Sequence, residues 1–114
     1  MKVSIRGKEL ELKHSFKAEL IFETAENHTF NGTSTKDWIT MFYCTVLSSN
    51  KDDDTWIKFN DFVDWLDEDD NGTYLYDFIT SYTEHAVALN ELRQAKKDEE
   101  EKKGKSKNAK GAKN

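Results

Sequence analysis

The segment Thr35–Ser48 constrains the fold most, because it is apolar on nearly every face. It reads TKDWITMFYCTVLS, and helical spacing leaves it almost no polar stripe. A helix of this kind lies at the centre of a core or at an interface. Ser34 or Thr35 is suited to cap its start, and Asp37 complements the helix dipole in the first turn. We therefore expect a core helix at 35–48, with one side available to a partner.

Other elements are predicted on both sides of this helix. Residues 2–13 alternate between apolar and polar and contain Gly7, which predicts a β-hairpin. Val3 and Ile5 share one face of its first strand, and Leu10 and Leu12 share one face of the second. Further helices are expected at about 16–26, 57–68 and 73–95. An isolated hairpin is marginally stable, so its apolar face must pack on these helices.

Capping residues mark the starts of these further helices. Ser15, Thr55 and Thr73 are suited to cap them, and Gly72 is suited to end the third helix in a left-handed conformation.

Apolar stripes at helical spacing indicate which side of each helix faces the core. The expected stripes are Phe16, Leu20, Ile21 and Thr24 in the first helix, Phe59, Phe62, Val63 and Leu66 in the third, and Leu75, Phe78, Ile79, Tyr82, Ala86, Leu89 and Leu92 in the last. The fold class predicted is α+β, mainly α, with an N-terminal β-hairpin followed by a four-helix body. The body is a single domain at 1–95. The charged tail at 96–114 is expected to be disordered, because it buries too little apolar area to order itself. Glu–Lys pairs in its first part could instead extend the last helix.

Charge is distributed unevenly along the chain. Residues 1–95 hold 9 Lys and Arg against 18 Asp and Glu, a net charge of −9, and residues 96–114 hold 8 Lys against 4 acids, a net charge of +4. An acidic body argues against nucleic-acid binding, which needs a basic face. No apolar run reaches the roughly 18 residues of a membrane span, and the N-terminus lacks the apolar stretch of a signal peptide. We expect a cytoplasmic protein that binds neither nucleic acid nor membrane.

The stretch DEDDNG at 67–72 resembles the first half of a calcium loop. Asp67, Asp69 and Asn71 occupy positions 1, 3 and 5 of an EF-hand pattern, and Gly72 occupies position 6. Position 12, which should be a bidentate Glu, is Phe78. These three residues are therefore weak metal candidates, and a solvated turn between two helices is the better interpretation.

Catalytic constellations are not apparent in the sequence. Cys44 lies in an apolar helix without a neighbouring base, which is typical of a buried structural thiol. The three histidines lack metal-ligand spacing, and no phosphate-binding glycine motif occurs. We expect no enzyme activity and no cofactor.

The acidic stretch 52–77 carries ten Asp and Glu residues and one Lys. A solubilising face is the simplest interpretation. An acidic adaptor or inhibitor that docks a basic partner is an alternative, because such a stretch would steer a positively charged surface.

A more specific hypothesis comes from the order of the pieces. A hairpin, VSIRGKELELKHS, leads into a helix with the pattern SFKAELIFE, an aromatic-rich helix DWITMFYCTVL, a helix FNDFVDWLDEDD, and a last helix with a charged tail. Over about residues 1–92 this resembles the small tail assembly chaperones of long-tailed bacteriophages and prophages. The resemblance implies a non-catalytic cytoplasmic protein that keeps the long, apolar tape measure protein soluble while tail tube subunits assemble around it. Many members of that family are also made as a longer form by ribosomal frameshifting. The C-terminal Lys run is consistent with a slippery codon stretch, and whether this chain has a longer form stays open.

The resemblance supplies no binding motif, so candidate contacts come from the surplus of aromatic residues. Trp38, Tyr43, Trp56 and Trp65 are the partner-binding candidates, with core packing as the alternative for each. The expected partners are the tape measure protein and the tail tube protein. The oligomeric state stays open, with a homo-oligomer among the alternatives.

Overall fold

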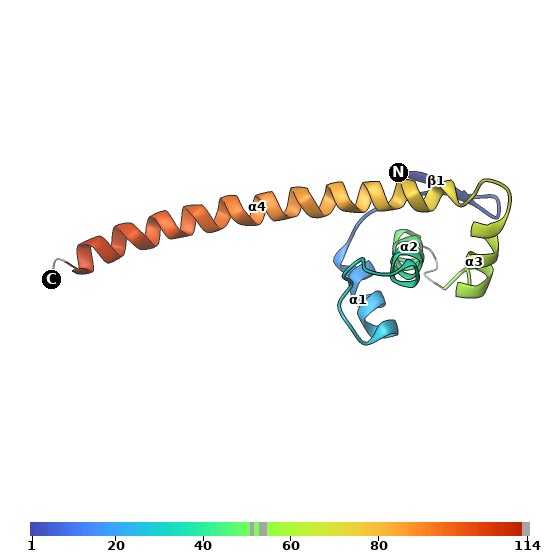
Figure 1. Ribbon diagram of the computed structural model, residues 1–114, viewed down its shortest axis with the longest axis horizontal. Helices are drawn as coiled ribbons and strands as arrows, with labels where there is room; N and C mark the ends of the chain where they lie inside the picture. The colour runs from blue at the N-terminus through green and yellow to red at the C-terminus, as the bar shows by residue number, and fades with distance from the viewer. Residues whose placement is uncertain (51, 53–54, 113–114) are drawn as a thin grey trace. The chain divides into compact units, whose positions relative to one another are not determined.

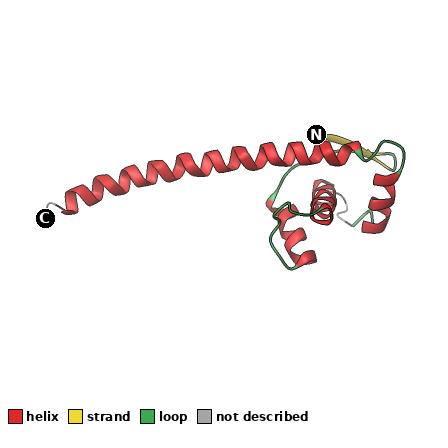
Figure 2. Ribbon diagram, viewed as in Figure 1, coloured by secondary structure: helices red, strands yellow, loops and turns green. Residues whose placement is uncertain are grey.

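The computed structural model describes residues 1–50, 52 and 55–112, with side chains described as far as residue 100. Over these residues a two-stranded sheet is followed by four helices (Figures 1 and 2). The elements are β1 (Lys2–Ile5), β2 (Lys8–Glu11), α1 (Phe16–Glu26), α2 (Thr35–Ser49), α3 (Phe59–Asp67) and α4 (Thr73–Ala112). The predicted α+β, mainly α class is confirmed. The chain divides into two units, residues 1–82 and residues 83–114.

The hairpin turns over two residues, Arg6 and Gly7. Both have positive φ, 51° and 81°, as a type I′ turn requires. The strands pair antiparallel, with Val3 opposite Leu10. Val3 and Ile5 are buried together with Leu10 and Leu12, so the predicted alternation is confirmed. The hairpin thus contributes its whole apolar side to the core.

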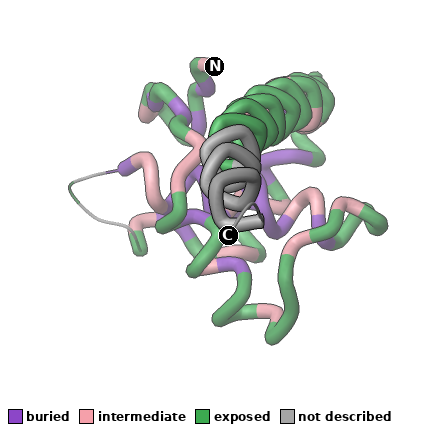
Figure 3. The backbone as a smooth tube through the Cα atoms, turned by 90° about the vertical axis from the view of Figure 1, so that its left-hand side faces the viewer, coloured by how far each residue is buried: buried purple, intermediate pink, exposed green. Residues whose placement is uncertain are grey.

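Helix α2 is the core helix that its composition predicts. In residues 1–82 it lies between α1 and α3 (Figure 1), and eight of its 15 residues are buried. Figure 3 colours the buried residues of the described chain purple. Phe42 is fully buried, meeting Phe62 edge to face at 5.1 Å and stacking on Phe78 at 4.8 Å. Offset and edge-to-face ring pairs add about 0.5–1.5 kcal/mol each beyond area burial. These rings join α2, α3 and α4 in one core.

The first two helix starts follow the predicted caps. The Ser15 hydroxyl accepts from the Ala18 N–H at 3.1 Å, and the Ser34 hydroxyl accepts from the Asp37 N–H at 3.1 Å. The start of α3 differs, because its N-cap residue is Lys58, which makes no side-chain capping bond. Thr55 lies three residues too early to cap it. A serine at each of the first two junctions therefore fixes where α1 and α2 begin.

The α3–α4 connection does not use Gly72 as predicted. The left-handed residue is Asp69, with φ 46°, and Gly72 does not have positive φ. The end of α3 is instead bonded by the side chain of Asn71, whose amide donates to the Trp65 carbonyl at 2.9 Å. Thr73 is the first residue of α4, and its hydroxyl donates to the Asp70 carbonyl at 2.8 Å. The prediction of a left-handed stop at Gly72 is wrong because an asparagine side chain satisfies the helix end.

The second unit, described over residues 83–112, is helical throughout. The sequence predicts a helix at about 73–95, with a charged tail after it, and α4 spans Thr73–Ala112. Lys, Glu, Gln and Ala dominate 94–103, and these residues favour helix without tertiary packing. Gln94 and Asp98 add a hydrogen bond across one turn at 3.2 Å.

Candidate binding surface

Helix α1 turns a different side toward the core from the one that its apolar stripe predicts. We call this orientation about the helix axis the phase of α1. Ala18 and Phe22 are fully buried, whereas Phe16 is 73% exposed and Leu20 is 62% exposed. The prediction that Phe16, Leu20, Ile21 and Thr24 face the core is therefore wrong, since only Ile21 is partly buried.

Aromatic packing selects the observed phase. Phe22 meets Phe30 at 5.3 Å and His28 at 5.4 Å, both edge to face. Ala18 has a side chain small enough for α1 to lie close against α2. The helix has apolar residues on both sides, so periodicity could not decide which side is buried.

The opposite side of α1 is mostly apolar and mostly exposed, and we call it the α1 outer face. Successive residues of a helix advance by roughly 100°, which places its members within one half of the helix surface. It consists of Phe16, Leu20, the partly buried Ile21, Thr24 and Ala25, and the exposed Lys17 lies among them. A shallow hollow of about 390 Å³ lies on it, lined by Lys17, Leu20, Ile21, Thr24 and Ala25. Contiguous exposed apolar surface of this kind marks interaction sites in soluble proteins.

Carboxylates border the α1 outer face on one side. Glu19 and Glu23 are exposed there. Glu19 is held in place because it accepts a hydrogen bond from the Tyr82 hydroxyl at 3.1 Å. The pKa of Tyr82 is raised strongly, first by burial and then by the Glu19 charge and hydrogen bond. A binding partner on this face therefore meets apolar side chains and Lys17, with carboxylates along one edge.

Trp65 is part of the core and offers no surface to a partner. It is 3% exposed, stacks on Tyr74 at 5.5 Å and touches Phe62. For this candidate the core-packing alternative describes what the structure shows.

Trp38 and Tyr43 are partly buried, and each ties a loop to α2. The Trp38 ring nitrogen donates to the Gly32 carbonyl at 3.1 Å. The Tyr43 hydroxyl donates to the Ile57 carbonyl at 2.7 Å, and burial raises its pKa. Gly32 has φ 68°, and a Cβ there would lie 3.0 Å from the Trp38 ring. Both side chains therefore position loops, with their polar atoms already used.

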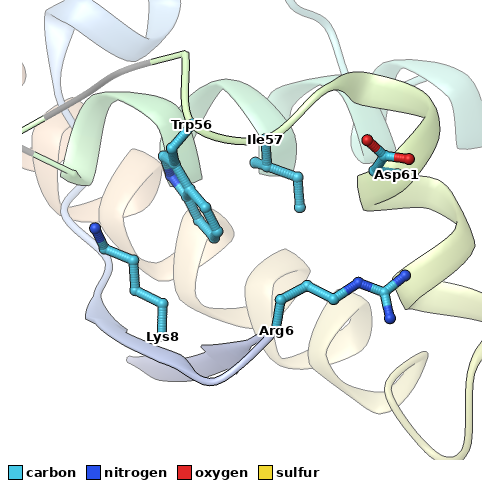
Figure 4. A pocket seen from close by; sticks show the side chains of 5 residues that line it. All are labelled: Arg6, Lys8, Trp56, Ile57 and Asp61. Atoms are coloured by element: carbon cyan, nitrogen blue, oxygen red, sulfur yellow. The ribbon is translucent and has the colours of Figure 1, made fainter.

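Trp56 lines an open hollow of about 440 Å³ between the hairpin turn and the start of α3, together with Arg6, Lys8, Ile57 and Asp61. Figure 4 shows the Trp56 ring and Lys8 on one side of the hollow, with the Arg6 guanidinium and Asp61 on the other. The Lys8 ammonium lies 5.4 Å from the Trp56 ring centroid, a cation–π distance. The two terminal nitrogens of the Arg6 guanidinium contact the two Glu68 carboxylate oxygens, at 2.8 and 2.7 Å. Positive and negative side chains therefore both line the hollow, and the Arg6 guanidinium is already paired with Glu68.

The calcium candidates lie in a turn that does not have the form of an EF-hand loop. Asp67 is the last residue of α3, Asp69 is left-handed, and Asn71 uses its amide on the Trp65 carbonyl. The twelfth position, Phe78, is helical and fully buried. Over the residues that the structure describes, no three His, Cys, Asp or Glu side chains are grouped to hold a metal. The fold thus replaces the second half of the loop with α4.

Cys44 has the surroundings of a structural thiol. It is 1% exposed, and burial, with a smaller effect of the Glu26 charge, raises its pKa to about 12. A nucleophilic cysteine needs a lowered pKa.

The acidic stretch 52–77 is largely exposed where it is described. Asp53 and Asp54 lie outside the described residues, and Glu68 is paired with Arg6. The remaining exposed carboxylates belong to Asp52, Asp61, Asp64, Asp67, Asp69, Asp70 and Asp77.

Comparison with protein-family models, with curated proteins and with solved structures finds no match to this chain. Over the described residues, no helix combines the length and the apolar character that crossing a membrane requires.

Proposed function

We propose that this protein is a non-catalytic phage tail assembly chaperone, which holds the tape measure protein soluble in the host cytoplasm until tail tube subunits assemble around it. The element order that resembles this family supports the proposal. The observation that carries it is the α1 outer face, where Phe16 and Leu20 are exposed on a folded, acidic body.

Apolar surface and net charge together suit a protein that holds an apolar client. Fully burying a Leu or Phe side chain is worth about 1.5–3 kcal/mol, so Phe16 and Leu20 supply a meaningful part of a reversible contact. The chain carries a net charge of −5, which keeps a complex dispersed. Binding of this kind needs no catalytic group.

Co-expression with a tape measure fragment from the same phage tests the proposal. The fragment should move from the insoluble to the soluble fraction when this protein is present, and should co-purify with it. Leu20→Glu should abolish this effect, because it places a charge in the centre of the α1 outer face.

Tyr76→Glu is the matched control, since Tyr76 is 72% exposed but lies on α4, outside the α1 outer face. It should leave the fragment soluble. A fragment that stays as insoluble with the wild-type protein as without it would overturn the proposal. The gene offers an independent check: a slippery heptamer near the codons for residues 96–110, with an overlapping downstream frame, is expected.

A second candidate function, docking of a basic partner, is favoured by the exposed carboxylates of Asp61, Asp64 and Asp67. Such binding should weaken steeply between low and high salt, because exposed charges are screened. Client binding that is insensitive to salt would favour the apolar contact over this alternative.

A further inference from the structure

The tripeptide Asn-Gly-Thr occurs twice in this chain, at 31–33 and at 71–73. An asparagine followed by glycine is prone to spontaneous deamidation, because glycine has no side chain to hinder attack by its own backbone nitrogen. The residue after the asparagine dominates this rate in an unfolded chain, so both copies should react similarly there. A difference between them in the folded protein therefore comes from the structure around each asparagine.

The first copy lies in the loop between α1 and α2, where Asn31 is exposed. The Thr33 N–H donates to Asn31 Oδ1 at 3.1 Å, and the Thr33 hydroxyl donates to the same oxygen at 2.7 Å. Both donors stabilise the negative charge that develops on this oxygen when a nucleophile attacks the side-chain carbon. Asn31 therefore combines exposure with a side-chain carbonyl that is activated toward attack.

The second copy is held differently, in the connection between α3 and α4. Asn71 is partly buried, and its amide nitrogen donates to the Trp65 carbonyl at 2.9 Å. The Thr73 hydroxyl donates to the Asp70 carbonyl at 2.8 Å instead of to the asparagine. The backbone already turns into α4, because the Tyr74 N–H donates to the Asn71 carbonyl at 3.0 Å. A helical turn keeps the next backbone nitrogen away from the side-chain carbon, so attack here requires local unfolding.

We propose that Asn31, activated by Thr33, is a site of spontaneous deamidation in the folded protein, and that the fold protects Asn71. The Gly32 backbone nitrogen loses its proton to water or hydroxide and attacks Cγ of Asn31. The bond between Cγ and Nδ2 breaks, the amide nitrogen takes up a proton and leaves as ammonia, and a cyclic succinimide remains. Water then opens the ring at one of its carbonyls and leaves aspartate or isoaspartate at position 31. The net reaction is hydrolysis of the side-chain amide, with water as the only co-reactant.

A carboxylate has different consequences at the two positions. At position 31 it keeps the oxygen acceptor that both Thr33 donors use, so aspartate preserves these bonds. Isoaspartate adds a carbon atom to the main chain next to Gly32, whose carbonyl accepts from the Trp38 ring nitrogen at 3.1 Å. At position 71 a carboxylate cannot donate to the Trp65 carbonyl, so the side-chain bond at the end of α3 is lost. Protection of the second asparagine therefore preserves the connection between α3 and α4.

Peptide mapping by mass spectrometry tests the proposal on the full chain, aged at mildly alkaline pH and physiological temperature. One sample stays folded, and a second is aged unfolded in guanidinium chloride. The two asparagines should convert at similar rates in the unfolded sample. In the folded sample Asn31 should convert at least about tenfold faster than Asn71, because conversion of Asn71 waits for local unfolding. Equal rates in the folded protein would overturn the proposal, and so would an Asn31 that reacts more slowly folded than unfolded.

The matched threonine variants test the activation. Thr33→Val removes the hydroxyl donor and should slow conversion of Asn31 at least about threefold, relative to the same variant aged unfolded. Thr73→Val should leave the rate at Asn31 unchanged, because the Thr73 hydroxyl bonds elsewhere. A rate at Asn31 that does not respond to Thr33→Val would overturn its activation by Thr33.

The two products are compared directly by substitution. Asn71→Asp should lower the melting temperature by about 4 °C or more, because a hydrogen bond to the Trp65 carbonyl is lost. Asn31→Asp should lower it by less, since the acceptor oxygen remains. A larger loss for Asn31→Asp than for Asn71→Asp would contradict the roles assigned to the two side chains.

Discussion

The phase of α1 decides which of its residues face a partner, and two alanine substitutions test it. Phe22→Ala removes a fully buried ring that contacts Phe30, and should cost about 3–5 kcal/mol of unfolding free energy through lost burial and a residual cavity. Leu20→Ala removes a side chain that is 62% exposed, and should change stability by no more than about 0.5 kcal/mol.

Urea unfolding followed by circular dichroism measures both changes. With a slope of about 1 kcal/mol per molar for a domain of this size, Phe22→Ala should lower the midpoint by several molar and Leu20→Ala by less than about half a molar. Because small domains have only about 5–15 kcal/mol in total, Phe22→Leu serves as a milder variant, with an expected cost below about 1.5 kcal/mol. A larger loss for Leu20→Ala than for Phe22→Ala would refute the observed phase and remove the α1 outer face.

Three further predictions concern the turn, the thiol and the acidic loop. Gly7→Ala should destabilise the chain by about 1 kcal/mol or more in thermal unfolding, because φ is 81° there, whereas Lys8→Ala should cost less. The free energy of unfolding should fall as pH rises from about 9 toward 12, because the folded-state pKa values of Cys44 and Tyr82 are raised and the unfolded chain loses these protons first. Cys44→Ala should make this fall with pH less steep. Millimolar calcium should leave the melting temperature unchanged, and a shift that Asp67→Ala removes would contradict the description of residues 67–72 as a turn without a metal site.

Much of the fold is predictable from local chemistry. The hairpin, the four helices and their order follow from alternation, helical spacing and the Ser15 and Ser34 caps, each of which depends on residues close in sequence. The buried α2 follows from its composition alone. Helix α4 begins at Thr73, as its helical spacing predicts.

The candidate surface is less predictable, because it depends on contacts between distant residues. Helix α1 has apolar residues on both sides. Phe22 is the buried one, and not Leu20, because the ring of Phe30 in the following loop packs against Phe22. Aromatic surplus pointed to Trp65, which the α3 and α4 rings bury. A helix with two apolar sides in the sequence was itself a signal that one of them would remain exposed.

The most direct test of the chaperone proposal is photo-crosslinking to the tape measure fragment from single positions on the surface. A photoreactive phenylalanine analogue placed at Leu20, in the centre of the α1 outer face, should cross-link to the co-expressed fragment. The same analogue at Tyr76, which is exposed elsewhere on the body, should not. Cross-linking from Tyr76 but not from Leu20, or from neither position, would contradict the assignment of the α1 outer face as the client-binding surface.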